Sequence, residues 1–331
     1  STLQTRLDSN IELIYYLKSF YLNNDKMSFD KFSQFSKSLV TPRTGVQSLE
    51  WIPKLAFDEK EIYESKMRSQ GFSSFSIFEI DENENQTPVR KRPWYYPAYY
   101  VYPYEENKNI HGLDLASHPK ISAAMEFSAE TGKLQISDVL ESVRQTEDFV
   151  FFAFMPVYGQ SDLVTNFQRK ESLVGFLLGV YHISTMISPQ LLSPEFPFDI
   201  YLFDASEHNY YAPILMTKHA ELGDIKYSEL PAKISDIEVL KTDIHLPGRL
   251  WKLVIAPKDK YLESFYSDVS LSLLIAGLLL SGLLAACLLL IIASLRQLGK
   301  IRKINESLDK RNSQLKEAYH DMEGFSYSVS H

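Results

Sequence analysis

The longest apolar stretch of the chain covers residues 269–295 and carries no charged residue. A helix needs about 20 apolar residues to cross the hydrocarbon core of a bilayer, and a soluble core helix rarely runs this far without a charge. The stretch therefore predicts one transmembrane helix. Gly277, Ser281 and Ala285 recur within it at a spacing that lets two membrane helices pack closely, although ordinary lipid-facing residues fit the pattern equally well.

Basic residues are distributed unequally on the two sides of this stretch. Four of them follow it within residues 296–303, whereas the nearest preceding ones are Lys258 and Lys260. Because positively charged flanks stay in the cytoplasm, we expect residues 1–260 outside the cytoplasm and the C-terminus inside, at the cell (inner) membrane. The chain starts at Ser1 with no apolar run before it, so we expect a signal or a first membrane helix upstream.

A helical pattern of apolar residues marks the beginning of the chain. The stripe consists of Leu3, Leu7, Ile11, Ile14, Leu17 and Tyr21. Its steps of three and four predict an N-terminal stalk helix within residues 1–27, continuing an upstream segment. The stripe is compatible with two partners, the core of its own chain or a second chain.

Two kinds of pattern alternate over residues 28–262. Strand-like runs of apolar and aromatic residues occupy 72–80, 97–104, 148–159 and 173–183, and again 198–206, 210–217, 235–246 and 249–257. Helical patterns occupy 58–70 and 118–132, where Gly71 and Gly132 mark the ends. Because the theme occurs twice, the sequence predicts an α+β architecture with two small sheets behind a long N-terminal helix.

Beyond the membrane stretch, over residues 296–331, the apolar residues follow a heptad. Its positions are Ile301, Ile304, Leu308, Leu315, Ala318, Met322, Phe325 and Val329, with Arg311 as an interruption. This narrow seam favours a parallel coiled coil between two chains, and hence a homodimer. The rival interpretation is a single amphipathic helix that lies on the membrane.

Composition and charge narrow the chemistry further. The only cysteine, Cys287, lies in the apolar stretch, so neither an intrachain disulfide nor a cysteine-based metal site is expected. The sequence holds no HExxH or GxGxxG motif, which disfavours a metal site and a bound cofactor in this chain. The net charge of −8 argues against nucleic-acid binding. We expect Arg90, Lys91 and Arg92 to form a solvated loop.

Five short motifs follow one another in the outer part of the chain. They are GVQSLEWIPKL (45–55), YYPAYYVYPYEEN (95–107), HGLDLASHP (111–119), AETGKLQIS (129–137) and FMPVYG (154–159). In this order they resemble the motifs of CHASE domains, which are extracellular sensor modules of membrane receptors. The resemblance implies a membrane-distal PAS-like sensor domain at 28–185, which holds the ligand, and a membrane-proximal PAS-like domain at 186–262.

The resemblance also implies a ligand site. In cytokinin-binding relatives an aspartate of the LD motif hydrogen-bonds the adenine-like ring, and the matching residue is Asp114. A main-chain contact would fall near Leu134 or Ile136. The expected apolar walls are Tyr100, Tyr102, Phe152 and Phe154. The residues alone also allow Asp114 to be a turn or helix-capping residue. A cytokinin is one candidate ligand; another nutrient or signalling molecule, or no ligand at all, is the alternative.

The last residues, FSYSVSH (325–331), resemble the first half of the phosphoacceptor box of sensor histidine kinases. The resemblance makes His331 the phosphoacceptor, since a neutral imidazole nitrogen is nucleophilic near neutral pH. It implies a two-component sensor kinase truncated before the domain that binds ATP and Mg, with a response regulator as partner. The alternatives are a sensor joined to a nucleotide or diguanylate cyclase, and a receptor that only binds.

Overall fold

The structure, a computed structural model, divides into two compact units, Ser1–Asp259 and Lys260–His331. It describes residues 2–24, 27–41, 45–81, 85–141, 149–161, 163–187, 191, 193–206, 214–217 and 239–329. The first unit contains the sheets that position the candidate site, and the described part of the second unit is helical.

Helix α1 (Thr2–Leu22) opens the first unit and buries one side of its surface. Leu7, Ile11, Ile14 and Leu17 of the predicted stripe are at most 3% exposed. They belong to a core cluster shared with the first sheet. The stripe therefore faces the core of its own chain, which answers the question that its spacing left open.

Helix α2 (Phe29–Leu39) is an element that the sequence patterns miss. Ser28 caps its first turn by accepting a hydrogen bond from the main-chain N–H of Lys31 at 3.3 Å. The rings of Phe20 and Phe35 stack with their centroids 4.0 Å apart. This stack joins α1 to α2, so the two helices form one layer.

The first sheet has six strands that pair antiparallel in the order β6-β1-β10-β9-β7, with β8 also beside β9. Its strands are β1 (Val46–Pro53), β6 (Tyr100–Tyr102), β7 (Gln135–Ile136), β8 (Leu140–Glu141), β9 (Phe149–Tyr158) and β10 (Leu173–His182). The predicted strands at 148–159 and 173–183 are confirmed as β9 and β10. Strand β1 is not predicted by an alternation of apolar and polar residues, because most of its residues are buried whichever face they point to.

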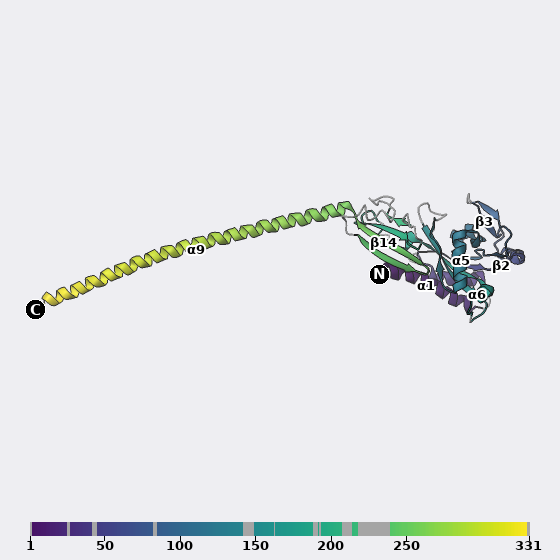
Figure 1. Ribbon diagram of the computed structural model, residues 1–331, viewed down its shortest axis with the longest axis horizontal. Helices are drawn as coiled ribbons and strands as arrows, with labels where there is room; N and C mark the ends of the chain where they lie inside the picture. Colours follow the sequence, from purple (N-terminus) through teal and green to yellow (C-terminus); the bar gives the residue numbers. More distant parts are fainter. Residues whose placement is uncertain are drawn as a thin grey trace. The chain divides into compact units, whose positions relative to one another are not determined.

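Side chains alternate along each strand, so the sheet contributes to two cores. On one face Trp51, Phe151 and Leu177 pack with residues of α1 and α2. On the other face Ile52 and Leu178 pack with residues of α5 (Pro119–Thr131). We call these the α1 face and the α5 face, and both helices can be followed in Figure 1.

Short elements fill the space around this sheet. The predicted helix at 118–132 is confirmed as α5, which ends where Gly132 adopts a φ of +74°. Of the predicted strand at 72–80, only β3 is extended in a ladder, because turns occupy the residues before it. The short elements are β2 (Leu55–Ala56), η1 (Phe57–Glu59), α3 (Lys60–Ser69), β3 (Phe78–Ile80), β4 (Gln86–Pro88), β5 (Trp94–Tyr95), α4 (Tyr104–Asn107), η2 (Lys108–Ile110), η3 (Leu115–Ser117), α6 (Asn166–Ser172) and α7 (Ile183–Met186).

The second sheet has four strands in the order β12-β11-β14-β13. They are β11 (Phe198–Asp204), β12 (Leu215–Met216), β13 (Leu240–Leu246) and β14 (Arg249–Pro257). Arg249 pairs with Asp138, next to the first sheet, and with Asp204 of β11 at 3.1 Å. The predicted mixture of a long helix and two sheets is therefore confirmed, although residues 210–213 and 235–238 of two predicted strands lie outside the described residues.

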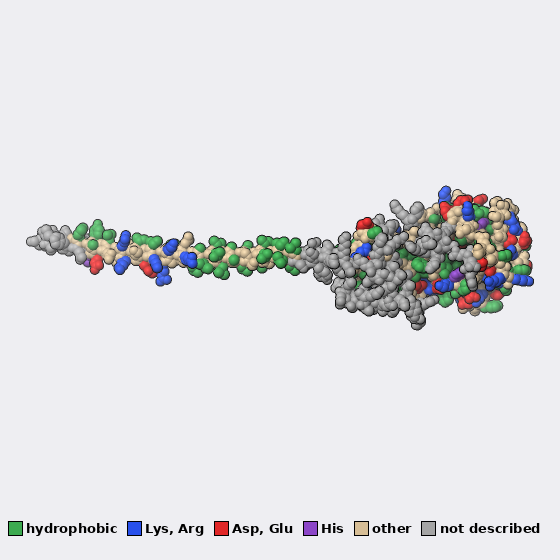
Figure 2. All heavy atoms as spheres, turned by 90° about the horizontal axis from the view of Figure 1, so that it is seen from above, with side chains coloured by type: hydrophobic (Ala, Val, Ile, Leu, Met, Phe, Trp, Pro, Cys, Tyr) green, Lys and Arg blue, Asp and Glu red, His purple; other side chains and the backbone are tan. Residues whose placement is uncertain are grey.

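Helix α9 (Asp259–Val329) is the described part of the second unit. Its stretch Leu271–His320 includes a window with a mean hydropathy of 2.8, which is long and apolar enough to cross a membrane. None of this window is buried, whereas a core helix of a soluble protein is mostly buried. Figure 2 shows apolar side chains gathered along one length of the helix and charged side chains appearing farther on.

Candidate functional site

Asp114 is held by main-chain hydrogen bonds on both sides. Its N–H donates to the carbonyl of Phe78 in β3 at 2.9 Å. The neighbouring Leu113 carbonyl accepts from Ala98, and the Leu115 N–H donates to the carbonyl of Tyr96 at 3.0 Å. The segment around Asp114 thus lies between β3 and residues 96–98 like a short additional strand. These main-chain hydrogen bonds hold the backbone at Asp114 in place in the absence of a ligand.

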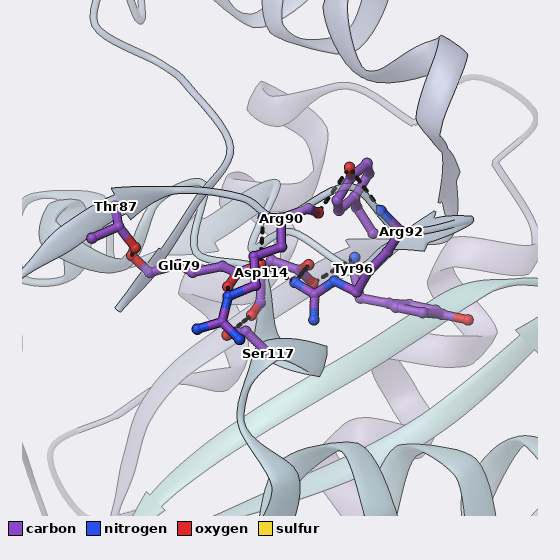
Figure 3. Close-up of polar contacts among 8 residues, drawn as sticks. Glu79, Thr87, Arg90, Arg92, Tyr96, Asp114 and Ser117 are labelled. Atoms are coloured by element: carbon purple, nitrogen blue, oxygen red, sulfur yellow. Dashed lines mark hydrogen bonds and ion pairs between the residues drawn. The ribbon is translucent and has the colours of Figure 1, made fainter. Parts of the chain in front are cut away.

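The Asp114 carboxylate is fully buried, and Tyr96 and Arg92 both donate hydrogen bonds to it. Its Oδ1 accepts a hydrogen bond from the main-chain N–H of Tyr96 at 2.9 Å, and its Oδ2 accepts one from Nη2 of Arg92 at 2.8 Å. Figure 3 shows these groups converging on the carboxylate. Although Asp114 occupies the N-cap position of η3, its side chain makes no capping hydrogen bond there. The carboxylate is therefore turned toward Arg92 and Tyr96.

Arg92 links Asp114 to a second buried carboxylate. The same Nη2 atom that donates to Asp114 also donates to Oε1 of Glu79, which additionally accepts from the main-chain N–H of Arg90 at 2.9 Å. Glu79 is 7% exposed, whereas the Arg92 side chain is 30% exposed. Nε of Arg92 is buried and has no hydrogen-bond partner in the part of the chain that the structure describes. One guanidinium nitrogen thus serves two carboxylates.

The electrostatics of this cluster favour an additional hydrogen-bond donor. Burial raises the pKa of the Asp114 carboxyl, and the N–H of Tyr96 and the charge of Arg92 limit that rise. Glu79 also pairs with Arg90, whose side chain is 90% exposed and whose Nε lies 3.8 Å from the Glu79 carboxylate. Among the described residues, the fully buried Asp114 thus depends on Arg92 alone for a charged partner. An additional donor that reaches Asp114 would therefore further compensate its buried charge.

Aromatic rings lie beside Asp114 on the α5 face. The ring centroids of Tyr96 and Phe176 are 5.8 Å apart, and those of Phe176 and Phe154 are 5.9 Å apart. Phe152 stacks on Phe154 with a centroid distance of 6.3 Å. Burial, and then the nearby Asp114 carboxylate, raise the pKa of Tyr96 to about 12, so its phenol is neutral. Phe152 and Phe154 thus lie on the α5 face, in the same core as Tyr96, whose main-chain N–H binds Asp114.

The other two predicted wall residues lie on the opposite face. Tyr100 belongs to the core shared with α1 and α2, where its ring centroid is 5.9 Å from that of Phe32. Tyr102 packs against the same cluster, since it is two residues farther along β6. Because the sheet separates Tyr100 and Tyr102 from Phe152 and Phe154, the four rings do not enclose a single pocket.

Leu134 and Ile136 also direct their side chains to the α1 face, where both are buried. Their main chain lies at the edge of the first sheet, where β7 pairs with β9. The N–H of Ile136 donates to the carbonyl of Pro247 at 3.1 Å. In this structure the Ile136 N–H therefore joins the two sheets.

Arg92, Glu79 and Tyr96 are the site residues that the sequence patterns miss. The expectation of a solvated loop at Arg90–Arg92 is wrong for Arg92, which is partly buried in the ion-pair cluster. The physical reason is that a fully buried carboxylate requires a compensating charge or donor. A prediction that Asp114 is buried would have implied a basic or donating partner, because a buried carboxylate requires one.

Among the residues that the structure describes, no group of three or more His, Cys, Asp or Glu side chains is arranged to hold a metal ion. The predicted phosphoacceptor His331 lies outside the described residues.

Comparison with known proteins identifies a family and a relative. Residues 25–213 match the CHASE domain. A germination-specific adenylate cyclase of Dictyostelium discoideum is 30% identical to this chain over 102 residues. That match covers 30% of this chain and 12% of the cyclase, so the chain spans only a small part of this relative.

Two solved structures of bacterial receptors also match this chain, at low sequence identity. The periplasmic sensory domain of the Campylobacter jejuni chemoreceptor Tlp1 is 11% identical, with a TM-score of 0.47 over 78% of this chain and 90% of that one. The ligand-binding domain of the Pseudomonas aeruginosa amino acid chemoreceptor PctC, in complex with GABA, is 13% identical, with a TM-score of 0.42 over 78% and 94% of the two chains.

Proposed function

Because this chain belongs to the CHASE-domain family, we propose that it is the ligand-sensing and transmembrane signalling part of a two-component sensor histidine kinase. The CHASE domain and the apolar window of α9 together indicate a membrane protein with an extracellular sensor. In our proposal the sensor binds a small molecule, α9 crosses the membrane, and His331 accepts a phosphoryl group on the cytoplasmic side.

Ligand binding is proposed for the α5 face because Asp114 offers a buried polar anchor there. Small-molecule sites combine apolar walls with a few fixed polar groups that select the ligand. Asp114 supplies the polar group, and Tyr96, Phe154 and Phe176 supply neighbouring rings. An adenine-like molecule fits this combination, since it has flat apolar faces and N–H donors on its edge.

The binding proposal is tested by thermal-shift screening and calorimetry of the chain in detergent micelles against adenine derivatives and other small metabolites. Asp114→Ala should abolish the shift produced by any compound that stabilises the wild type. Asp58→Ala, at an exposed position of η1, is the matched control and should leave the shift unchanged. A compound that stabilises the wild type and Asp114→Ala equally would show that the ligand is bound elsewhere.

Phosphoryl transfer is proposed for His331 because the FSYSVSH box lies at the end of a heptad pattern. An imidazole nitrogen attacks the γ-phosphorus of ATP, which is held by a domain outside this chain, and ADP leaves. An aspartate carboxylate of a response regulator then takes the phosphoryl group and frees the histidine. The exposed residues Ile301, Ile304 and Leu308 of α9 support the proposed coiled coil, because such a seam needs a partner helix.

The phosphorylation proposal is tested by adding a histidine-kinase catalytic domain and labelled ATP to the chain. His331→Gln should remove the acid-labile label. His320→Gln, which changes a histidine of α9, is the control and should retain it. Unchanged incorporation into His331→Gln would refute the assigned role.

A second output is favoured by one comparison. The similarity to the Dictyostelium adenylate cyclase supports a receptor in which the same kind of sensor controls a nucleotide cyclase. In that case residues 296–331 would form only a connecting helix. The sequence that follows His331 in the parent gene discriminates the two: an acidic residue and then a run of Leu, Arg and Pro supports the kinase, and a cyclase domain supports the alternative.

A further inference from the structure

The contacts of Arg92 are unusual for a structural ion pair. An arginine that anchors a carboxylate commonly uses two parallel N–H groups, which makes the pair stronger and geometrically fixed. Here Asp114 and Glu79 both contact the single atom Nη2, while Nε is buried without a partner in the described chain. A buried idle donor costs free energy. The present arrangement is therefore not the best one available to this guanidinium.

Glu79 gives Arg92 an alternative position close by. If the guanidinium left Asp114, it could offer both Nε and Nη2 to Glu79 and form the two parallel hydrogen bonds that it lacks now. Arg92 would keep a charged partner throughout, so its release from Asp114 would not leave it isolated. The Arg92 side chain is also 30% exposed, which leaves it room to move on the solvent side of the fully buried Asp114.

We propose that Arg92 closes the Asp114 site as an internal counter-ion and moves onto Glu79 when a ligand donates a hydrogen bond to Oδ2 of Asp114. This inference rests on the proposed ligand site and adds its regulation. The Oδ1 atom stays bound to the N–H of Tyr96, so Oδ2 is the atom that changes partner. The ligand must bring an N–H donor or an ammonium group.

The contact between Arg92 and Asp114 lowers the affinity of the site for a ligand, because every ligand must displace Arg92 from Asp114. Hydrogen bonds that involve a charged group are worth more than neutral ones. Removing the guanidinium should therefore tighten binding of a donor ligand by about tenfold or more. Glu79 acts in the opposite direction, since it holds the guanidinium in the open state. Its loss should weaken binding by a similar factor.

The test measures the dissociation constant of 6-benzylaminopurine, an adenine derivative with an apolar arm, by calorimetry on the whole chain in detergent micelles. Arg92→Met and Arg92→Gln should both bind it at least about tenfold more tightly than the wild type. Arg92→Lys keeps the charge and should stay near the wild-type value. Two neutral variants are used so that one remains if the other fails to fold, as checked by circular dichroism.

Glu79→Gln provides the second arm of the experiment. In the wild-type background it should weaken binding by about tenfold, whereas in the Arg92→Met background it should change the affinity by less than about twofold. This difference is expected because Glu79 acts on the ligand only through Arg92. An equal effect in both backgrounds would overturn the proposed exchange of partners.

The remaining outcomes separate this inference from the proposed function. We call the displacement of Arg92 from Asp114 by the ligand the Arg92 gate. Binding to Arg92→Met but not to the wild type would support this gate, because the guanidinium would then block the wild-type site completely. Wild-type or weaker affinity of both neutral variants overturns the gate, while the ligand site at Asp114 stands; weaker affinity would make Arg92 a ligand contact. Binding to none of the proteins overturns both the adenine-like ligand and a gate that opens for it.

Discussion

Gln4 pairs through its side-chain amide with both main-chain polar groups of His245. Nε2 of Gln4 donates to the His245 carbonyl at 2.7 Å, and Oε1 accepts from the His245 N–H at 2.8 Å. His245 belongs to β13, which is an edge strand of the second sheet. The Gln4 side chain therefore satisfies the main-chain N–H and C=O of one edge residue, as a neighbouring strand would. It also joins α1 to the second sheet.

Replacing Gln4 by Leu should loosen this edge. Both main-chain groups of His245 then lose their partner, and we expect faster hydrogen–deuterium exchange of the His245 amide and a loss of about 1 kcal/mol of unfolding free energy. Asp8→Ala is the control, because it removes only the 2.9 Å contact of Gln4 within α1. Equal exchange rates in Gln4→Leu and the wild type would contradict this assignment.

Tyr181 should contribute to stability through its hydroxyl group. The hydroxyl donates to the main-chain carbonyl of Asn10 in α1 at 3.0 Å, and the ring stacks on Phe151 with a centroid distance of 5.1 Å. Tyr181→Phe keeps the stack but leaves a buried carbonyl without this donor, so we expect a loss of about 1–3 kcal/mol in urea unfolding. Tyr16→Phe, at an exposed position of the same helix, should change the midpoint little.

Gly112 and Gly71 form a natural pair for separating backbone strain from collision. Their φ angles are +99° and +101°, so an alanine is strained at both positions. A Cβ at Gly112 would also collide with the main-chain carbonyl oxygen of Ser76, whereas a Cβ at Gly71 meets no heavy atom within 4 Å. We expect Gly71→Ala to cost about 1–2 kcal/mol and Gly112→Ala clearly more. Equal unfolding midpoints of the two variants would argue against this packing of the Asp114 segment.

His111 should make the fold sensitive to acid. Burial lowers its pKa to about 4, although its Nε2 donates to the carbonyl of Tyr99 at 2.9 Å, a hydrogen bond that favours the charged form. The unfolded chain binds a proton at a histidine near pH 6.5, whereas the folded chain resists it. Stability is therefore fully present above about pH 6.5 and is lost as the pH falls to about 4, by on the order of 3 kcal/mol.

The measurement compares urea unfolding of the wild type and His111→Phe between pH 7.5 and pH 4. The variant should be less stable at pH 7.5, because the Tyr99 carbonyl loses its donor, but its stability should fall less on acidification. His245→Gln, which changes an exposed histidine, is the control. Parallel pH curves for the wild type and His111→Phe would exclude His111 as the origin of the acid sensitivity.

The direction in which α9 crosses the membrane is tested by chemical labelling. A membrane-impermeant amine reagent added to intact cells should modify Lys258, which precedes the apolar window, and spare Lys310, which follows it. Peptide mass spectrometry distinguishes the two sites. After the cells are opened, both should react. Modification of Lys310 alone in intact cells would reverse the topology and place sensing and phosphorylation on the wrong sides.

Local patterns predict those elements whose burial follows from their own periodicity. The stripe of α1 is of this kind, since it buries side chains at regular intervals. Strands β9 and β10 are buried on both faces, and their long runs of apolar and aromatic residues predict them instead. Strand β1 is also largely buried, but Gln47, Ser48 and Glu50 interrupt its apolar run, so neither alternation nor a continuous apolar stretch predicts it. Helix α2 is stabilised by its cap at Ser28 and by its stack with α1, which depends on a neighbour that periodicity does not describe.

The candidate site shows where such reasoning stops. A period of two correctly groups Tyr100 with Tyr102 and Phe152 with Phe154, but the face that each pair occupies depends on how β6 and β9 are placed in the sheet. Arg92 is a similar case. Nothing in the triplet Arg90–Arg92 indicates which side chain turns inward, because the partner that selects it lies 22 residues away.

Neighbouring residues of β10 touch opposite sides of the first sheet. Val180 packs in the core on the α5 face, while Tyr181, the next residue, donates a hydrogen bond to the carbonyl of Asn10 in α1. A small shift of the peptide between them would be felt by both cores at once. A displacement caused by a ligand at the proposed site would then reach α1 across a single strand. It would not require a conformational change along the length of the domain.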